Sequence, residues 1–203
     1  MSQFVFEIGM EEMPAGFLPG LENHSKTLFT EQFVENFIPY AGIEVASTPR
    51  RLVVQVQGLA PRQSEQEELL IGPPRSVAYD EEGALNKAGQ GFLRSKDVLE
   101  DDLFIHSTEK GDYLAVRKKV GGAETLSRLP EICQAVLRKL PFPKKMRWEQ
   151  SAFVFGRPIR WLLALLDDAV VQVQIASKTA GNLTYGHRVL GPGPWGVPDA
   201  GSY

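Results

Sequence analysis

The first sixty residues alternate between patterns typical of strands and of a helix. Large apolar residues occupy every second position across residues 4–8, which predicts a strand that ends at a glycine. Apolar residues then recur at helical spacing across 18–37, and strand-like alternation returns at 43–45 and 52–56. A strand, a helix and two strands form half of a split β-α-β unit. We therefore expect residues 1–60 to form a first subdomain with a helix on one face of its sheet.

The composition becomes polar between residues 61 and 68, where three glutamates follow Arg62. This segment is predicted to be a linker between two subdomains. The second subdomain is expected to span residues 69–190. The segment 191–203 is rich in proline and glycine, and it is expected to be an irregular tail at a point of truncation.

Helical spacing predicts two helices in the second subdomain, over 87–98 and 126–140. Between them, a turn at 109–112 is predicted to join two alternating segments into a hairpin. Gly89 and Gly91 each lower helix stability by about 1 kcal/mol relative to alanine. Close packing of the backbone at the first helix is the expected reason for them.

Apolar alternation also predicts strands at 159–165 and 171–175, on either side of a turn. We expect these two strands to pair with each other in antiparallel orientation. The predicted fold class is α+β, with mostly antiparallel sheets, helices packed on one face, and two subdomains.

Composition narrows the possible functions. The 203-residue chain has a formal net charge of −3, so a contact with nucleic acid requires a local basic patch. The single cysteine, Cys133, falls in an apolar helical pattern and is expected to be a buried residue of a protein in a reducing compartment. The longest apolar run, 161–166, is too short to span a bilayer, and the first residues lack a signal-peptide pattern. A cytoplasmic location is expected.

Cations and aromatic residues are concentrated in the segment 141–166, PFPKKMRWEQSAFVFGRPIRWLLALL. Its five cations suit a polyanion or a carboxylate-rich partner, and its rings could hold them in place. They are Lys144, Lys145, Arg147, Arg157 and Arg160. The alternative is that these side chains are solvated strand ends, and that the two tryptophans of the segment belong to the core.

Two further basic clusters lie elsewhere, at Arg50-Arg51 before a predicted strand and at His187-Arg188. If the fold places acidic residues on other surfaces, one face becomes positive despite the net charge. Such a face would attract an RNA backbone in a salt-dependent manner.

No catalytic or metal-binding pattern accompanies these clusters. The three histidines are scattered, and neither a phosphate-binding loop nor a hydrolase or metalloprotease motif is found in the sequence. Glu11 and Glu12 are adjacent, so in a strand or a helix they would diverge. The sequence therefore favours binding over catalysis.

Seven short motifs together resemble a known family, the β subunit of bacterial heterotetrameric glycyl-tRNA synthetase. They occur in the family's order along nearly the whole chain: FEIGMEEMPA at 6–15, TPRRL at 48–52, GP at 72–73, GF at 91–92, PKKMRW at 143–148, RPIRW at 157–161 and GHR at 186–188. The chain departs from the family pattern at Met10, Gly89 and Lys145. It is similar to the amino-terminal third of the family's longer chains.

The resemblance implies a division of labour. In this family the α subunit carries the active site that activates glycine with ATP, and the β subunit supports tRNA binding in an α2β2 assembly. Accordingly, ATP and Mg²⁺ are expected on the α subunit, and no cofactor, metal or catalytic residue is expected on this chain. The partners implied are the α subunit and tRNA, without DNA or membrane. A fold-level analogy with archaeal CCA-adding enzymes points to the acceptor arm of tRNA.

Two hypotheses for the basic residues remain. In the first, they contact tRNA phosphates. In the second, they form ion pairs with Glu7, Glu11 or Glu12, and the chain is a scaffold without direct tRNA contact. The candidates are Arg50, Arg51, Lys144, Lys145, Arg147, Arg157, Arg160, His187 and Arg188.

Overall fold

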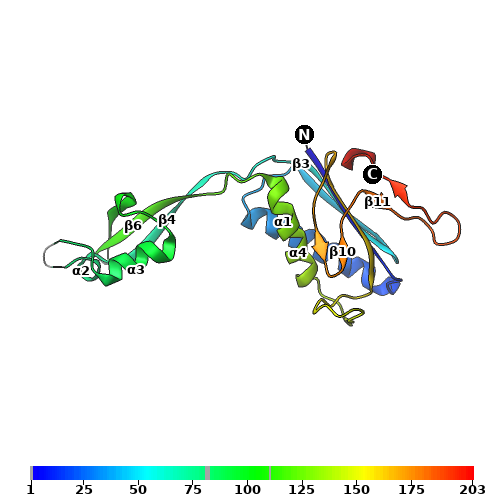
Figure 1. The fold of residues 1–203 in the computed structure, drawn as a ribbon, viewed down its shortest axis with the longest axis horizontal. Helices are drawn as coiled ribbons and strands as arrows, with labels where there is room; N and C mark the ends of the chain where they lie inside the picture. The colour runs from blue at the N-terminus through cyan, green and yellow to red at the C-terminus, as the bar shows by residue number, and fades with distance from the viewer. Residues whose placement is uncertain (1, 81–82, 110) are drawn as a thin grey trace. The chain divides into compact units, whose positions relative to one another are not determined.

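The computed structural model describes residues 2–80, 83–109 and 111–203. The chain forms two compact units, shown in Figure 1. Unit 1 comprises Met1–Ser64 and Gly122–Tyr203, and unit 2 comprises Glu65–Gly121. The predicted α+β class, with its antiparallel sheets, is confirmed.

Unit 1 is built on a five-stranded sheet in the order β2-β3-β1-β7-β8. Every neighbouring pair in this sheet is antiparallel. The strands are β1 (Ser2–Met10), β2 (Gly42–Thr48), β3 (Arg51–Leu59), β7 (Ile159–Leu166) and β8 (Ala169–Val170). The three strands predicted before residue 60 are confirmed, and β1 occupies the middle of the sheet.

The helices of unit 1 cover one face of this sheet. The short η1 (Ala15–Phe17) leads into α1 (Leu18–Glu35), and α4 (Thr125–Lys139) packs beside α1, as Figure 1 shows. Phe6 of β1, Phe29 of α1 and Ile132 of α4 belong to the same buried core. On the other face, Val5 and Leu163 pack against Val197 and Ala200 of the C-terminal segment. Because both faces of β1 are buried, nearly all of its side chains are withdrawn from solvent.

The segment after β7 does not form the predicted strand pair, and that prediction is wrong. β7 pairs with β1 along most of its length and with β8 only at Leu165 and Leu166. Val171, Val173 and Ile175 are buried in the main core, so their alternation reflects packing rather than a ladder with β7. The short elements that follow are β9 (Gln174–Ile175), β10 (Lys178–Thr179), β11 (Leu183–Thr184), β12 (Trp195–Gly196) and η3 (Ala200–Ser202).

Unit 2 is a smaller α+β body. Its sheet has the order β4-β6-β5, and all of its pairs are antiparallel. Its elements are β4 (Gln66–Pro74), α2 (Arg75–Ala78), α3 (Lys87–Lys96), η2 (Glu100–Asp102), β5 (Leu103–Thr108) and β6 (Gly111–Val120). The predicted helix and hairpin are confirmed here, although Lys110 of the expected turn lies outside the described residues.

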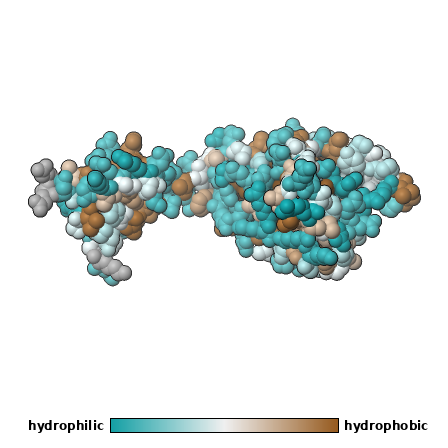
Figure 2. Space-filling view, turned by 60° about the horizontal axis from the view of Figure 1, so that its bottom comes forward, coloured by the Kyte–Doolittle hydropathy of each residue, from teal (hydrophilic) through white to brown (hydrophobic). Residues whose placement is uncertain are grey.

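Close packing explains one glycine of α3. A Cβ atom at Gly89 would lie 2.8 Å from the Ala78 carbonyl oxygen and 2.4 Å from a Leu85 methyl carbon, as expected from the sequence. The core of unit 2 also contains Phe92, Leu114 and Val116. Apolar residues also reach the surface of this unit in Figure 2.

The two units divide the chain differently from the predicted boundaries. Residues 66–68 of the expected linker belong to β4, and the chain returns to unit 1 at Gly122 rather than staying in one subdomain up to residue 190. Helix α4 packs in the core that α1 also fills. A helical period shows that a helix has an apolar face, but it does not show which sheet that face will cover.

Candidate functional site

The site is organised around Glu7, a carboxylate in the middle strand that is fully buried. One of its oxygens, Oε1, accepts hydrogen bonds from Trp161 Nε1 at 2.8 Å and from Thr184 Oγ1 at 2.9 Å. The same oxygen lies 3.0 Å from Arg51 Nε. A buried carboxylate needs such partners, because an unpaired charge in the interior is costly.

The strand register brings these partners together. Arg51 on β3 and Trp161 on β7 both lie opposite Gly9 of β1, one on each side. Glu7 is two residues from Gly9 and projects on the same face, so diagonal neighbours on both adjacent strands can reach it.

Gly9 leaves the space that the indole ring occupies. A Cβ atom at this position would lie 2.0 Å from two Trp161 ring atoms, so the ring lies directly against the backbone of β1. The guanidinium of Arg51 lies 6.0 Å from the centre of the same ring. The ring position is therefore determined by Gly9 beneath it and by the hydrogen bond to Glu7.

The segment before the Gly-His-Arg motif is tied to this cluster. Arg51 donates a hydrogen bond to the backbone carbonyl of Tyr185. The Tyr185 ring packs against Trp161, with centroids 5.1 Å apart and planes inclined by 52°. Burial, and then the charge of Glu7, raise the pKa of Tyr203, which keeps this nearby phenol neutral.

Glu11 gathers two of the predicted arginines at the end of β1. Its carboxylate lies 3.3 Å from Arg160 Nε and 2.8 Å from an Arg188 terminal nitrogen. Both guanidinium groups remain largely exposed, with 61% and 60% of each side chain accessible. Beside them, Arg157 Nε donates to the carbonyl oxygen of Glu12 at 2.9 Å. These contacts order the cations on the surface without burying them.

Two adjoining cavities open above this cluster, and we call them together the Arg50 cleft. One has a volume of about 530 Å³ and the other about 480 Å³. They share Arg50, Trp161, Tyr185 and Gly186. The first is also lined by Glu12, Thr48, Pro49, Arg51 and His187, and the second by Glu11, Arg160, Arg188 and Pro192.

The loop that carries His187 is closed by backbone contacts. A Cβ atom at Gly186 would lie 2.1 Å from the Gly191 carbonyl oxygen, so glycine permits this close approach. His187 Nδ1 accepts hydrogen bonds from the backbone amides of Val189 and Leu190, each at 3.2 Å. A nitrogen that accepts hydrogen bonds is unprotonated. In the neutral ring the proton therefore lies on Nε2, which is left as a donor.

The structure brings together five of the nine predicted site residues. The predicted candidates that line the Arg50 cleft are Arg50, Arg51, Arg160, His187 and Arg188. Arg157 lies beside the cleft through its contact with Glu12. The exposed side chains of Lys144, Lys145 and Arg147 line neither cavity and belong to a loop in which Trp148 packs edge-on against Phe153.

Tyr185 and Thr184 were not among the predicted site residues. Their position directly before the Gly-His-Arg motif is the only sequence signal that could have indicated them. Their roles depend on contacts with residues more than a hundred positions away. Thr184 donates a hydrogen bond to Glu7, and the Tyr185 carbonyl oxygen accepts one from Arg51.

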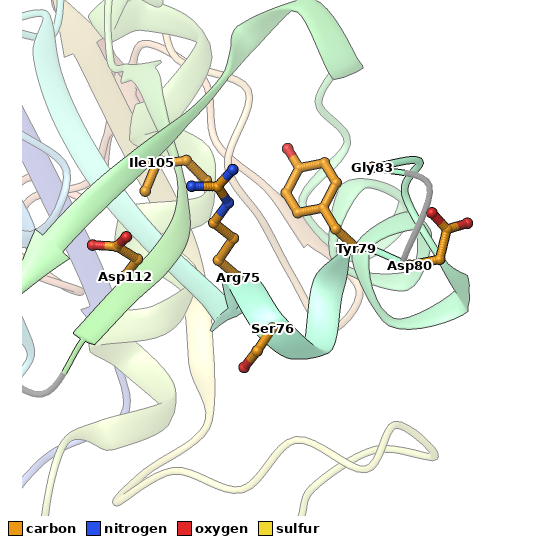
Figure 3. A pocket seen from close by; sticks show the side chains of 7 residues that line it. All are labelled: Arg75, Ser76, Tyr79, Asp80, Gly83, Ile105 and Asp112. Carbon is orange, nitrogen blue, oxygen red and sulfur yellow. The ribbon is translucent and has the colours of Figure 1, made fainter.

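Unit 2 has a larger cavity of a different character. It has a volume of about 950 Å³, and Figure 3 shows Arg75 reaching between Ile105 and Tyr79. Asp80 and Asp112 also line it, so this cavity has no excess of positive charge. None of the predicted site residues lies there.

The described part of the chain offers neither a metal-binding cluster nor a membrane-spanning helix. Residues 2–80, 83–109 and 111–203 contain no group of three or more histidine, cysteine or acidic side chains that could hold a metal ion. Among the same residues, no helix is long and apolar enough to cross a membrane.

Comparison with known proteins gives a consistent family. Residues 4–203 match the family model described as glycyl-tRNA synthetase beta subunit. The glycine–tRNA ligase beta subunits of Nitratidesulfovibrio vulgaris strain Hildenborough and Solidesulfovibrio magneticus are each 48% identical over 203 residues, and that of Moorella thermoacetica is 40% identical over 200 residues. These alignments cover 98–100% of this chain and 29% of each relative, so the chain spans less than a third of their length. The chain belongs to the glycyl-tRNA synthetase beta subunit family.

Proposed function

We propose that this chain acts as part of the β subunit of an α2β2 glycine–tRNA ligase and supports binding of the acceptor arm of tRNA. The α subunit, with ATP and Mg²⁺, then attaches glycine to the tRNA. Family membership supports the assignment to the ligase, because the matched relatives are beta subunits of that enzyme.

The observation that carries the proposed tRNA contact is the gathering of cations at the Arg50 cleft. In a chain with a net charge of −3, Arg50, Arg160 and Arg188 line one cavity and His187 lines its neighbour. Exposed arginines held at fixed positions suit phosphate groups, because a guanidinium can donate two hydrogen bonds to one phosphate.

Substitutions in the assembled synthetase test this contact. Arg160→Ala and Arg188→Ala should each weaken tRNA binding about ten- to a hundredfold, since a hydrogen bond to a charged group such as phosphate contributes about 1.5–3 kcal/mol. Arg62→Ala is a matched control, because Arg62 is 65% exposed and pairs with Glu124 at 3.1 Å but lines neither cavity. Equal tRNA affinity for all three variants would contradict the proposal.

Glycine activation tests the division of labour. Glycine-dependent ATP–pyrophosphate exchange should not occur with this chain alone and should appear when the α subunit is added. Exchange by the chain alone would mean that adenylate chemistry takes place on it, and the proposed assignment of chemistry to the α subunit would then be wrong.

A scaffold without tRNA contact is the second candidate function, and the ion pairs favour it. Arg51 is engaged by the buried Glu7, while Arg160 and Arg188 share Glu11. Unfolding measurements discriminate between the two functions. A scaffold role predicts that Arg160→Ala and Arg188→Ala lower stability and leave tRNA affinity unchanged, whereas phosphate contacts predict the reverse.

A further inference from the structure

Arg50 is the least engaged cation of the Arg50 cleft. Its Nε atom is buried and has no hydrogen-bond partner among the described residues. The other three arginines of the cleft are in ion pairs with Glu7 or Glu11. A buried donor without an acceptor is uncommon in folded proteins, and Glu7 Oε2, Arg128 Nε and Tyr203 Oη are in the same state. Arg50 differs from the other three groups because its side chain lines both cavities of the cleft.

The charges around the cleft leave room for one negative charge. Four arginines line it, and three glutamates lie in it or directly beneath it: Glu7, Glu11 and Glu12. The excess is therefore one positive charge. A phosphodiester carries one negative charge, so it balances this excess, whereas a triphosphate would exceed it.

Aromatic rings form part of the same wall. Trp161 is held between Gly9 and its hydrogen bond to Glu7, and Tyr185 packs against it. Both rings line both cavities. Nucleic-acid bases bind to such aromatic side chains by stacking, with little dependence on which base is present.

The cavity volumes and the donor on His187 are both compatible with a bound nucleotide. Each cavity is within the range of small-molecule sites, at about 530 and 480 Å³. The Nε2 proton of His187 provides a neutral donor in the cavity that Arg50 also lines. Ring, cation and neutral donor thus lie around one space.

We infer that the Arg50 cleft binds one nucleotide of single-stranded RNA. The base lies against Tyr185 and Trp161, and the phosphodiester lies at Arg50 and His187. This inference rests on the proposed function, which supplies RNA as the ligand. It goes further by assigning an unpaired nucleotide, rather than the backbone of a duplex, to this position.

Titration calorimetry on the 203-residue chain tests the inference with an adenylate trinucleotide as the probe. AMP and inorganic phosphate are titrated in parallel, because they share part of the chemistry. The trinucleotide should bind more tightly than either. Tyr185→Leu should weaken its binding about tenfold, the equivalent of about 1.4 kcal/mol, and Arg50→Ala should weaken it to a similar extent.

Two further variants serve as controls. Tyr185→Phe keeps the ring and should bind the trinucleotide within about twofold of the unmodified chain. Tyr79→Leu makes the same change in the cavity of unit 2 and should have no effect. Each variant's urea unfolding curve is recorded. If Tyr185→Leu alone fails to fold, Arg50→Ala and Tyr185→Phe still decide the outcome.

Different failures have different meanings. Undetectable trinucleotide binding, or equal binding by Tyr185→Leu, would overturn the nucleotide site but leave a tRNA contact through Arg160 and Arg188 intact. Binding of AMP or phosphate as tightly as the trinucleotide would overturn RNA as the ligand. A third outcome is that Tyr185→Leu weakens trinucleotide binding while Arg160→Ala and Arg188→Ala leave the tRNA affinity of the assembled enzyme unchanged. In that case the proposed tRNA contact is wrong and the nucleotide site stands.

Discussion

Replacing Arg51 with methionine tests the buried centre of the site. The change leaves the fully buried Glu7 carboxylate without its cationic partner, while the hydrogen bonds from Trp161 and Thr184 remain. Removing one partner of a buried ion pair costs about 3–5 kcal/mol. The Arg51 side chain is 28% exposed, so solvent screens part of the interaction. We therefore expect a loss near the lower end, about 3 kcal/mol.

Tryptophan fluorescence during urea unfolding measures this loss of stability in unit 1, the unit that contains Arg51 and Glu7. Trp148, Trp161 and Trp195 are the three tryptophans of the chain, and all lie in unit 1. The signal therefore reports the unfolding of that unit without a contribution from unit 2. The matched control is Arg62→Met, whose ion pair is 65% exposed on both sides and should contribute about 0–1 kcal/mol.

A double-mutant cycle completes this test. In Arg51→Met/Glu7→Gln no buried charge is left without a partner, so the double variant should be more stable than the sum of the two single losses predicts. A loss below about 1 kcal/mol for Arg51→Met, or strict additivity in the cycle, would refute the view that this pair organises the end of the sheet.

Two other predictions concern buried groups of unit 1. Gly9→Ala should destabilise this unit strongly, because the new Cβ would lie 2.0 Å from the Trp161 ring; a fluorescence unfolding curve like that of the unmodified chain would show that the ring can move. Burial raises the pKa of the Cys133 thiol in the folded protein, whereas the thiol of the unfolded chain has a pKa of about 8.5. The stability contributed by the neutral thiol is therefore complete below about pH 8.5 and falls as the pH rises above that value. Folded protein should therefore resist a thiol reagent at pH 8, and the pH dependence of stability above pH 8.5 should be shallower in Cys133→Ala.

Local patterns were sufficient to predict much of the fold. The strands and helix before residue 60, the hairpin and helix α4 follow from apolar periodicity and from turn residues, which act over short distances along the chain. The partner of β7 could not be obtained in this way, because β7 pairs with β1, about 155 residues earlier. Sequence proximity favoured the segment 171–175, and proximity does not determine which strand completes a sheet.

The cations that line the candidate site could be named from the sequence, but their arrangement could not. Charge clusters and motifs indicated Arg50, Arg51, Arg160 and Arg188 before any geometry was known. The structure separates their roles: Arg51 serves a buried carboxylate, while Arg50 has an unsatisfied donor. Tyr185 could not be predicted, because a ring acquires a role in a cleft only from what the fold places beside it.

The most direct test of the central claim is the salt dependence of tRNA binding by the assembled synthetase. In the variant Arg50→Ala/Arg160→Ala/Arg188→Ala, three proposed phosphate contacts are lost. The slope of log affinity against log salt should decrease in magnitude by about 2–3, since each contact to RNA or DNA releases about 0.7–0.9 counterion. Arg62→Ala should leave the slope unchanged. A slope for the triple variant equal to that of the unmodified enzyme would contradict the claim that the arginines of the Arg50 cleft contact tRNA.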